Sequence, residues 1–147
     1  FFFDVETKDV DKWDGRYKII NWLRKLRKDK NIRVRLLMTT GCIEYWLMLH
    51  RKYYTPSLQT VAEKESVIAE LKAAEPLYEK GDIEIISKIA EDYPVAIRNA
   101  RRTLCRLLED GMPELEDTDV RNQWLHRKCL TFSNVYEAIE FLENLEN

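Results

Sequence analysis

Two short stretches contain the acidic residues best suited to do chemistry. Residues 1–6 (FFFDVE) form an apolar run that ends in two carboxylates, Asp4 and Glu6. Residues 39–50 (TTGCIEYWLMLH) place a third carboxylate, Glu44, near the start of an apolar segment. Carboxylates that gather at one place repel one another, and a hard divalent cation such as Mg²⁺ is their usual counter-ion. Such a cation can orient a phosphodiester and activate water, so the pattern predicts a metal-dependent nuclease.

The elements around these acids predict why they meet. The bulky apolar residues 1–5 predict a buried strand, and residues 7–15 predict a polar loop. Residues 16–28 have the apolar period of an amphipathic helix, which ends at residues 29–31. Residues 32–38 predict a second strand. A strand, a helix and a strand form a βαβ unit with parallel strands.

Parallel strands bring their carboxyl ends to one edge of the sheet, where ligands bind. Asp4 and Glu6 end the first strand, and they point to one side if the chain stays extended. Residues 39–44 follow the second strand to the same edge, and residues 39–41 (TTG) predict a helix start capped by Thr. The sequence therefore predicts that Asp4, Glu6 and Glu44 converge as metal ligands.

Each of these residues also has an ordinary structural explanation. An acid at a strand end is typical of a loop or a cap. Glu44 in the first turn of a helix interacts favourably with the helix dipole. His50 on an apolar helix face is typical of a hydrogen-bonded core histidine.

The rest of the chain has helical patterning. Helices are predicted to end before Pro76, before Pro94 and at Gly111, whereas residues 121–130 have no assignment. Ser133 is expected to cap a final helix. We therefore expect an α/β fold, with a small parallel Toprim-like sheet in residues 1–50 and a helical extension in residues 51–147. Two strands are too few for a sheet, so either a preceding segment, absent from a chain that opens in mid-strand, or a later segment must pair with them.

Composition narrows the class of protein. The chain has 147 residues and a net charge of -2, which is compatible with a single domain. Cys42, Cys105 and Cys129 lack the C-x-x-C spacing, which favours reduced thiols in a cytoplasmic protein, each a small core residue. No apolar run has the length of a membrane span, and no signal peptide is present, so no membrane partner is expected.

Basic residues form three clusters that predict contact with nucleic acid phosphates. The first lies on the first helix, the second is a stripe along the third helix after residue 58, and the third lies beside Trp124. Charged residues that only solvate a helix face are the alternative for each cluster. The clusters are Arg24, Lys25, Arg27 and Lys28; then Arg98, Arg101, Arg102 and Arg106; then Arg121, His126, Arg127 and Lys128.

The order of motifs resembles the RloB family, whose members have a Toprim-type metal-binding core and are encoded near phage-defence genes. Its acidic strand end is similar to Asp4-Val5-Glu6, and its S-N-P-C-F-E-x-W-L-L-x-H segment is similar to residues 39–50. Its A-I-x-x-A and Y-x-K-x segments resemble residues 96–100 and 78–81, and its closing pattern resembles residues 133–145.

This resemblance implies a bacterial nuclease of antiphage defence that uses Mg²⁺ or Mn²⁺ and cuts DNA or RNA, with an ATPase or another defence protein as partner. It implies that Asp4 and Glu6 are metal ligands, that Glu44 is a ligand or organiser, and that His50 is a nearby structural or catalytic residue. The first Toprim strand and its glutamate are missing here, Glu6 replaces Asp, and Thr-Gly replaces Asn-Pro. A noncatalytic Toprim-like module that binds nucleic acid or a protein, and a plain helical interaction domain, are therefore the alternatives.

Overall fold

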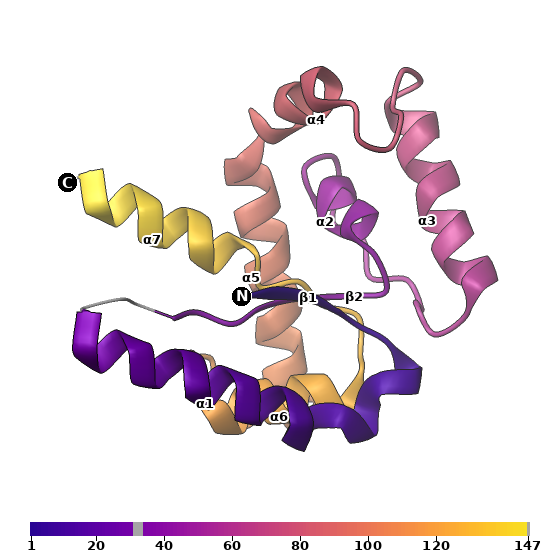
Figure 1. The fold of residues 1–147 in the computed structure, drawn as a ribbon. Coiled ribbons are helices and arrows are strands. Elements are labelled where there is room, and N and C mark those ends of the chain that lie inside the picture. The colour runs from indigo at the N-terminus through magenta and orange to yellow at the C-terminus, as the bar shows by residue number, and fades with distance from the viewer. Residues whose placement is uncertain (31–33, 147) are drawn as a thin grey trace.

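A computed structural model describes residues 1–30 and 34–146, and it has a mixed α/β fold with a small sheet and mostly helical structure (Figure 1). Strand β1 (Phe2–Val5) pairs in parallel with strand β2 (Leu37–Thr40), and helix α1 (Trp13–Lys30) connects them. The fold class and the parallel βαβ unit that the sequence predicted are thus confirmed.

Six further α-helices follow the second strand in the described part of the chain. Their starts are locally encoded: Thr60 and Glu63 form a capping box, Asp82 accepts two backbone N–H groups, and Pro94 lies in a first turn. The helices are α2 (Ile43–Leu49), α3 (Val61–Ala74), α4 (Ile83–Ala90), α5 (Tyr93–Glu109), α6 (Asp119–Lys128) and α7 (Tyr136–Glu146).

Several predicted boundaries were wrong. Residues Thr7–Lys12 form a 3₁₀-helix, η1, instead of a loop, and α1 continues through Asp29 to Lys30. The first residues of the predicted second strand, 32 and 33, lie outside the described residues, and β2 begins only at Leu37. The two threonines expected to start α2 belong to β2, because their backbone groups take part in strand pairing. Cys42 stands at the N-cap of α2 and makes no side-chain cap.

A later segment supports the two strands, which was one of the two possibilities left open by the sequence. The backbone N–H of Thr40 donates to the carbonyl of Phe132 at 3.0 Å, and that of Asn134 donates to Met38 at 3.1 Å. Ser133 forms an antiparallel bridge with Thr39, and their hydroxyls lie 2.6 Å apart. Ser133 therefore contacts the sheet three residues ahead of α7, which corrects the expected N-cap role.

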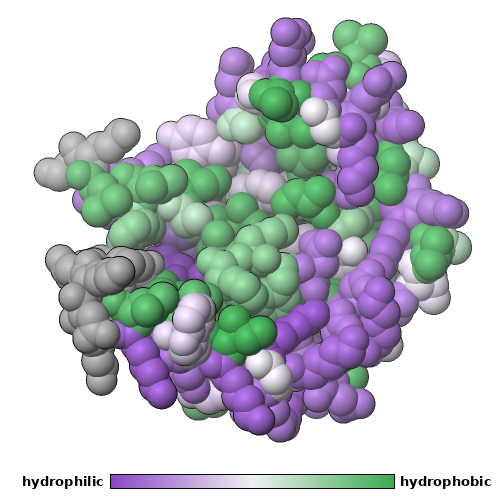
Figure 2. Space-filling view, viewed as in Figure 1, coloured by the Kyte–Doolittle hydropathy of each residue, from purple (hydrophilic) through white to green (hydrophobic). Residues whose placement is uncertain are grey.

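Strand β1 is mostly exposed, with Val5 as its one buried residue, which corrects the prediction of a buried strand. Val5 is fully buried, whereas Phe1 and Phe2 are 48% and 45% exposed. Helices α1 and α6 lie below the strand pair in Figure 1, and residues on both of them contact Phe3: Arg16 stacks on its ring and His126 packs beside it. Figure 2 accordingly shows hydrophobic residues at the surface over β1 and along α7.

Helix α2 is the buried centre of the other side of the fold, where it packs against α3, α4 and α5. Six of its seven residues are buried, including Glu44. The small residues Ala96 and Ala100 are fully buried in α5, which lets the two helices approach closely. Asn99 of α5 donates its amide to the carbonyl of Leu49 at 2.8 Å and so satisfies the end of α2. This packing fixes the position of Glu44.

Candidate functional site

The carboxyl ends of β1 and β2 form one edge, and the three predicted acids lie there. Asp4 is opposite Thr39 in the parallel register, and Glu6 keeps an extended backbone just after the strand. Asp4 and Glu6 therefore point to the same side, as expected for residues two apart. We call Asp4, Glu6 and Glu44 the carboxylate rim.

Glycine at position 41 makes the connection that brings Glu44 to this rim. Gly41 has a φ of 77°, in the left-handed region, and a Cβ there would lie 3.0 Å from the Cβ of Leu58. Its backbone N–H donates to the carbonyl of Val5 at 3.0 Å, which ties the turn to the end of β1. The turn therefore starts α2 directly beside the last residue of β1.

Electrostatics indicate that the rim carboxylates influence one another. Asp4 keeps access to solvent, yet partial burial raises its pKa, and the negative charges of Glu6 and Glu44 raise it further. The nearby Lys64 and Lys80 act in the opposite direction. The acids from β1 and α2 thus share one electrostatic environment, together with two lysines.

Glu44 is a buried carboxylate with an incomplete set of partners. It is only 1% exposed, and its Oε1 accepts a hydrogen bond from the hydroxyl of Tyr78 at 3.4 Å. The Nζ of Lys80 also lies 3.4 Å from that oxygen. Oε2 is buried and has no hydrogen-bond partner within the described part of the chain. A buried carboxylate oxygen without a donor is rare in folded proteins and calls for an explanation.

Glu6 is neutralised more completely. The ammonium groups of Lys64 and Lys8 both contact its carboxylate, the latter at 2.5 Å. Hydrogen bonds from Lys64 and then from Lys8 lower the pKa of Glu6, so it is ionised at neutral pH. Glu6 is therefore charged and engaged in ion pairs with two lysines.

Two further side chains next to Glu44 stay protonated at neutral pH. Burial, with a contribution from the charge of Glu44, raises the pKa of the Cys42 thiol to about 11. Burial and Glu44 likewise raise the pKa of Tyr78 to about 12. Cys42 is therefore not an activated nucleophile, and Tyr78 acts as a hydrogen-bond donor.

The rim provides the type of ligand atom that a hard divalent cation prefers, but its carboxylates are not arranged around a common point. All of its ligand atoms are carboxylate oxygens, and Oε2 of Glu44 lacks a partner. Throughout residues 1–30 and 34–146, no group of three or more His, Cys, Asp or Glu side chains is arranged to hold a metal. Lys64 and Lys80 provide positive charge at the rim instead.

His50 has the geometry of a core residue. It is 3% exposed, its Nδ1 lies 3.1 Å from the carbonyl oxygen of Trp46, and its ring packs edge-on against the ring of Trp46. Burial lowers its pKa, so it is neutral near pH 7. It follows the last residue of α2, at the opposite end of the helix from Glu44. These contacts match the core role that the sequence left open.

The side chains of the basic clusters differ in their exposure and in whether they already form ion pairs. Arg98 and Lys25 are exposed, whereas Arg24 pairs with Asp119 at 2.6 Å and Arg101 pairs with Glu140 at 2.6 Å. Arg27 and Lys28 lie on α1, but their side chains are outside the described ones. Of the residues named here, Arg98 and Lys25 thus direct their charge toward solvent, whereas Arg24 and Arg101 are already in ion pairs.

Aromatic residues accompany part of the second cluster. The guanidinium of Arg102 stacks on the ring of Tyr53 at 4.1 Å, and Arg106 donates to its hydroxyl at 3.3 Å. In the third cluster, Arg127 and Lys128 are exposed. A guanidinium nitrogen of Arg127 lies 3.5 Å from a carboxylate oxygen of Asp14.

Two members of the third cluster are buried, which corrects the prediction that they face nucleic acid. Arg121 is 0% exposed and forms a bidentate pair with Glu137. His126 is also 0% exposed, and its Nε2 lies 2.8 Å from a guanidinium nitrogen of Arg16. Arg121 thus connects α6 to α7, and His126 connects α6 to α1, so neither residue contributes to a charged surface.

Sequence reasoning missed the lysines of the rim. Lys64 lies on α3, and Lys80 lies in the turn before α4, so neither is near the acids in sequence. The sequence marks residues 78–81 only through their resemblance to a Y-x-K-x segment. Lys64 and Lys80 are sixteen residues apart, a spacing that matches no helix or strand period. They come close to the carboxylate rim because α3 packs against α2.

Comparison with known protein families agrees with the resemblance of the motifs to the RloB family. The family model described as RloB-like protein matches residues 2–142, so the chain belongs to the RloB-like family. The searches of curated proteins and of solved structures found no match. None of the helices in the described ranges is long and apolar enough to cross a membrane.

Proposed function

We propose that this RloB-like chain is a metal-dependent nuclease of an antiphage defence system, which hydrolyses phosphodiester bonds in DNA or RNA in the bacterial cytoplasm. The observation that carries the proposal is the buried Oε2 of Glu44, which has no partner in the described structure and belongs to the carboxylate rim. An unpartnered, buried carboxylate oxygen beside two further acids is well suited to a hard cation.

In this proposal, Asp4 and Glu44 hold Mg²⁺ or Mn²⁺, and Glu6 joins them when Lys64 leaves its carboxylate. The bound cation supplies positive charge that orients a phosphodiester and lowers the pKa of a water molecule. Tyr78 keeps the carboxylate of Glu44 in place by donating to its other oxygen. A Toprim-type core would place these residues at the same sheet edge, where the family resemblance expects them.

In the same proposal, Lys64 and Lys80 would contact the phosphate of the substrate. The side chain of Lys80 is 78% exposed, so it can turn from Glu44 toward a phosphate oxygen. Lys64 is 21% exposed and pairs with Glu6, and it would have to release this carboxylate for Glu6 to bind a cation. Each lysine would then be free to pair with a phosphate oxygen of the substrate in place of its carboxylate.

The basic residues of the three clusters would guide the nucleic acid to the rim. Salt-dependent phosphate contacts from several surface charges give affinity without sequence preference. A partner ATPase or another defence protein would contribute to the choice of substrate. The residues proposed for phosphate contact are Arg24, Lys25, Arg27, Lys28, Arg98, Arg101, Arg102, Arg127 and Lys128.

The test compares Asp4→Asn with a matched control, Asp11→Asn. Asp11 is an exposed acid of η1, outside the rim. Cleavage of labelled single- and double-stranded DNA and RNA is measured with Mg²⁺ and with Mn²⁺. We expect Asp4→Asn to reduce cleavage by about a hundredfold or more, and Asp11→Asn to leave it unchanged. Wild-type cleavage rates in Asp4→Asn would refute the assignment.

A noncatalytic module that binds nucleic acid or a partner protein is the second candidate. It is favoured by the ion pairs of Lys64 and Lys80, which already neutralise rim carboxylates. It predicts salt-sensitive binding that persists in EDTA, and no cleavage by the wild-type protein. Loss of nucleic acid binding in EDTA would exclude this alternative.

A further inference from the structure

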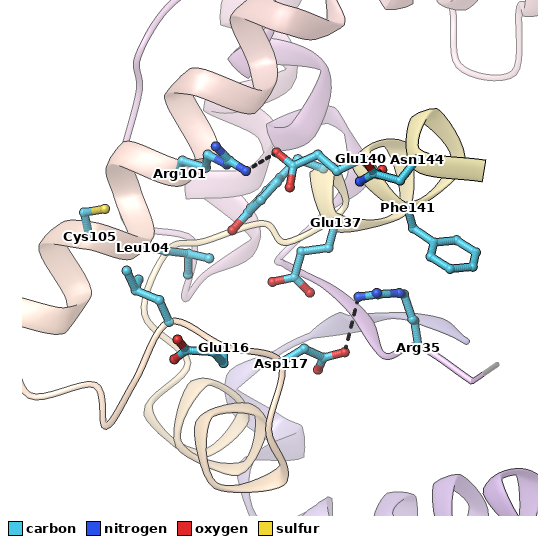
Figure 3. A pocket seen from close by; sticks show the side chains of 12 residues that line it. Arg35, Arg101, Leu104, Cys105, Glu116, Asp117, Glu137, Glu140, Phe141 and Asn144 are labelled. Carbon is cyan, nitrogen blue, oxygen red and sulfur yellow. Dashed lines mark hydrogen bonds and ion pairs between the residues drawn. The ribbon is translucent and has the colours of Figure 1, made fainter. Parts of the chain in front are cut away.

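A second candidate site lies away from the carboxylate rim, in a cavity of about 610 Å³ between α5, α7 and the loop that precedes α6 (Figure 3). Its volume lies within the usual range for small-molecule sites. The side chains of Leu104 and Leu115 and the ring of Tyr136 supply its apolar surface. None of the three rim carboxylates lines it.

The positive charges of this cavity are already paired. Arg101 lies 2.6 Å from Glu140, and Arg35 lies 3.8 Å from Asp117. Figure 3 shows these two pairs on opposite sides of the space that Glu137 faces. An anionic ligand would have to separate at least one pair before it gained a cationic contact. The pairing therefore disfavours a phosphate or a nucleotide.

The negative charges are in excess. Four carboxylates line the cavity, from Glu116, Asp117, Glu137 and Glu140, against the two guanidinium groups of Arg35 and Arg101. The buried Arg121 behind Glu137 supplies one further positive charge. Glu116 is exposed, and none of the described residues forms an ion pair with it. One negative charge is therefore available to a ligand.

The lining also shows which kind of cation it accommodates. The guanidinium of Arg35 stacks on the ring of Phe141 at 4.9 Å, and that of Arg101 lies 5.7 Å from the ring centre of Tyr136. A planar guanidinium can pair with a carboxylate and lie on an aromatic ring at the same time, which a compact ammonium does less well. The site thus already holds two such groups in this arrangement.

We infer that this cavity binds a ligand with a guanidinium group on an apolar stem, and that Glu116 is its principal ion-pair partner. The chemistry is that of arginine, present either as a free small molecule or as a side chain of a partner peptide. The apolar stem packs on Leu104 and Leu115, and the guanidinium reaches Glu116 beside the ring of Tyr136. This binding is independent of the proposed nuclease activity.

Cys105 provides a reporter for the test. It lines the cavity and is exposed, whereas Cys129 is buried and the pKa of Cys42 is raised to about 11. A thiol reagent should therefore modify Cys105 first, and mass spectrometry of the digested protein locates the label. Calorimetric titration measures the affinity of each probe independently of the label.

The probes are a capped arginine amide, the matching capped citrulline amide, agmatine and AMP. We expect the capped arginine to bind and to slow labelling of Cys105, and its uncharged citrulline counterpart to do neither. Tighter binding of agmatine would assign a free small molecule, and tighter binding of the capped arginine would assign a peptide. Equal binding of citrulline, binding of AMP alone, or no binding of either guanidinium would overturn the inference.

The variant Glu116→Gln locates the ion pair. Because Glu116 is exposed, its replacement leaves the fold intact, and we expect the affinity for the guanidinium probe to fall about three- to fivefold. Glu91→Gln is the matched control, since Glu91 is exposed and lies outside the cavity lining. An affinity equal to that of the wild type in Glu116→Gln would refute the role of this carboxylate.

Discussion

Replacing Lys80 by Gln tests whether a lysine and a metal compete for Glu44. The Nζ of Lys80 lies 3.4 Å from Oε1 of Glu44. At that distance the attraction is about 1 kcal/mol in a water-like dielectric, and pairs with an exposed member are measured at about 0.2–1 kcal/mol. A cation that binds Glu44 must overcome this attraction. Removing the charge of Lys80 should therefore raise the affinity of the Glu44 site for metal about two- to fivefold.

The same substitution should lower the stability of the metal-free protein and increase the stabilisation that metal binding gives. Without Lys80, the buried carboxylate of Glu44 loses a positive neighbour, so the free energy of unfolding without metal should fall slightly. Saturating metal should then add about 1 kcal/mol more stabilisation than in the wild type, because stabilisation grows with the logarithm of affinity. For a chain of 147 residues this is a further rise in Tm of about 3 °C.

Thermal unfolding with and without Mg²⁺ or Mn²⁺ measures both effects in one experiment. Lys88→Gln is the control, since Lys88 is an exposed lysine near the end of α4 with no ion pair to any described acid. A metal-induced shift in Lys80→Gln no larger than that of the wild type would refute the competition. If the wild type itself shows no metal-induced shift, the metal proposal fails instead, and the two failures remain distinct.

Two further predictions concern stability. Gly41→Ala should cost about 2 kcal/mol of unfolding free energy, because a Cβ would be strained at φ 77° and crowd Leu58, whereas Gly81→Ala, with φ 88° and open space, should cost only about 1 kcal/mol in a urea titration. Burial and the charge of Arg16 lower the pKa of His126 to about 4 from 6.5, so stability should fall as the pH drops from 6.5 toward 4, where the unfolded chain binds the extra proton. The loss should reach about 2–3 kcal/mol, and His126→Gln should remove it; an unchanged pH dependence in that variant would show that other groups cause it.

Local sequence signals predicted much of the secondary structure. The βαβ unit followed from two apolar runs around an amphipathic helix, and α4 matches its apolar period. The failures arose where tertiary contacts decide. Residues Thr39 and Thr40 have the side chains of a helix cap, but pairing with β1 and with Phe132 holds them in a strand. Helix α6 escaped assignment because its buried residues include Arg121, Asn122 and His126, which a hydrophobic pattern does not mark.

The candidate site shows the same division. Parallel strand topology was enough to bring Asp4 and Glu44 to one edge, because it depends only on the order of short elements. The partners of those acids come from α3, which packs on α2, and from the turn after α3. Helix α2, which carries Glu44, likewise packs on α5, a helix that begins only at Tyr93. A single sequence has no pattern that encodes these distances.

The two candidate sites differ in how permanently their charges are paired. At the rim, the ion-pair partner of Glu44 is Lys80, whose side chain is 78% exposed and whose Nζ lies 3.4 Å from Oε1 of Glu44. Beneath the cavity, Arg121 is 0% exposed and gives two hydrogen bonds to Glu137, two to Asn122 and one to the carbonyl of Leu115. A flexible, solvated lysine can exchange its partner at little cost, whereas removing either member of a buried bidentate pair leaves an uncompensated charge. We therefore expect exchange of a lysine for a metal ion at the rim, whereas the Arg121–Glu137 pair holds α6 and α7 together beneath the cavity.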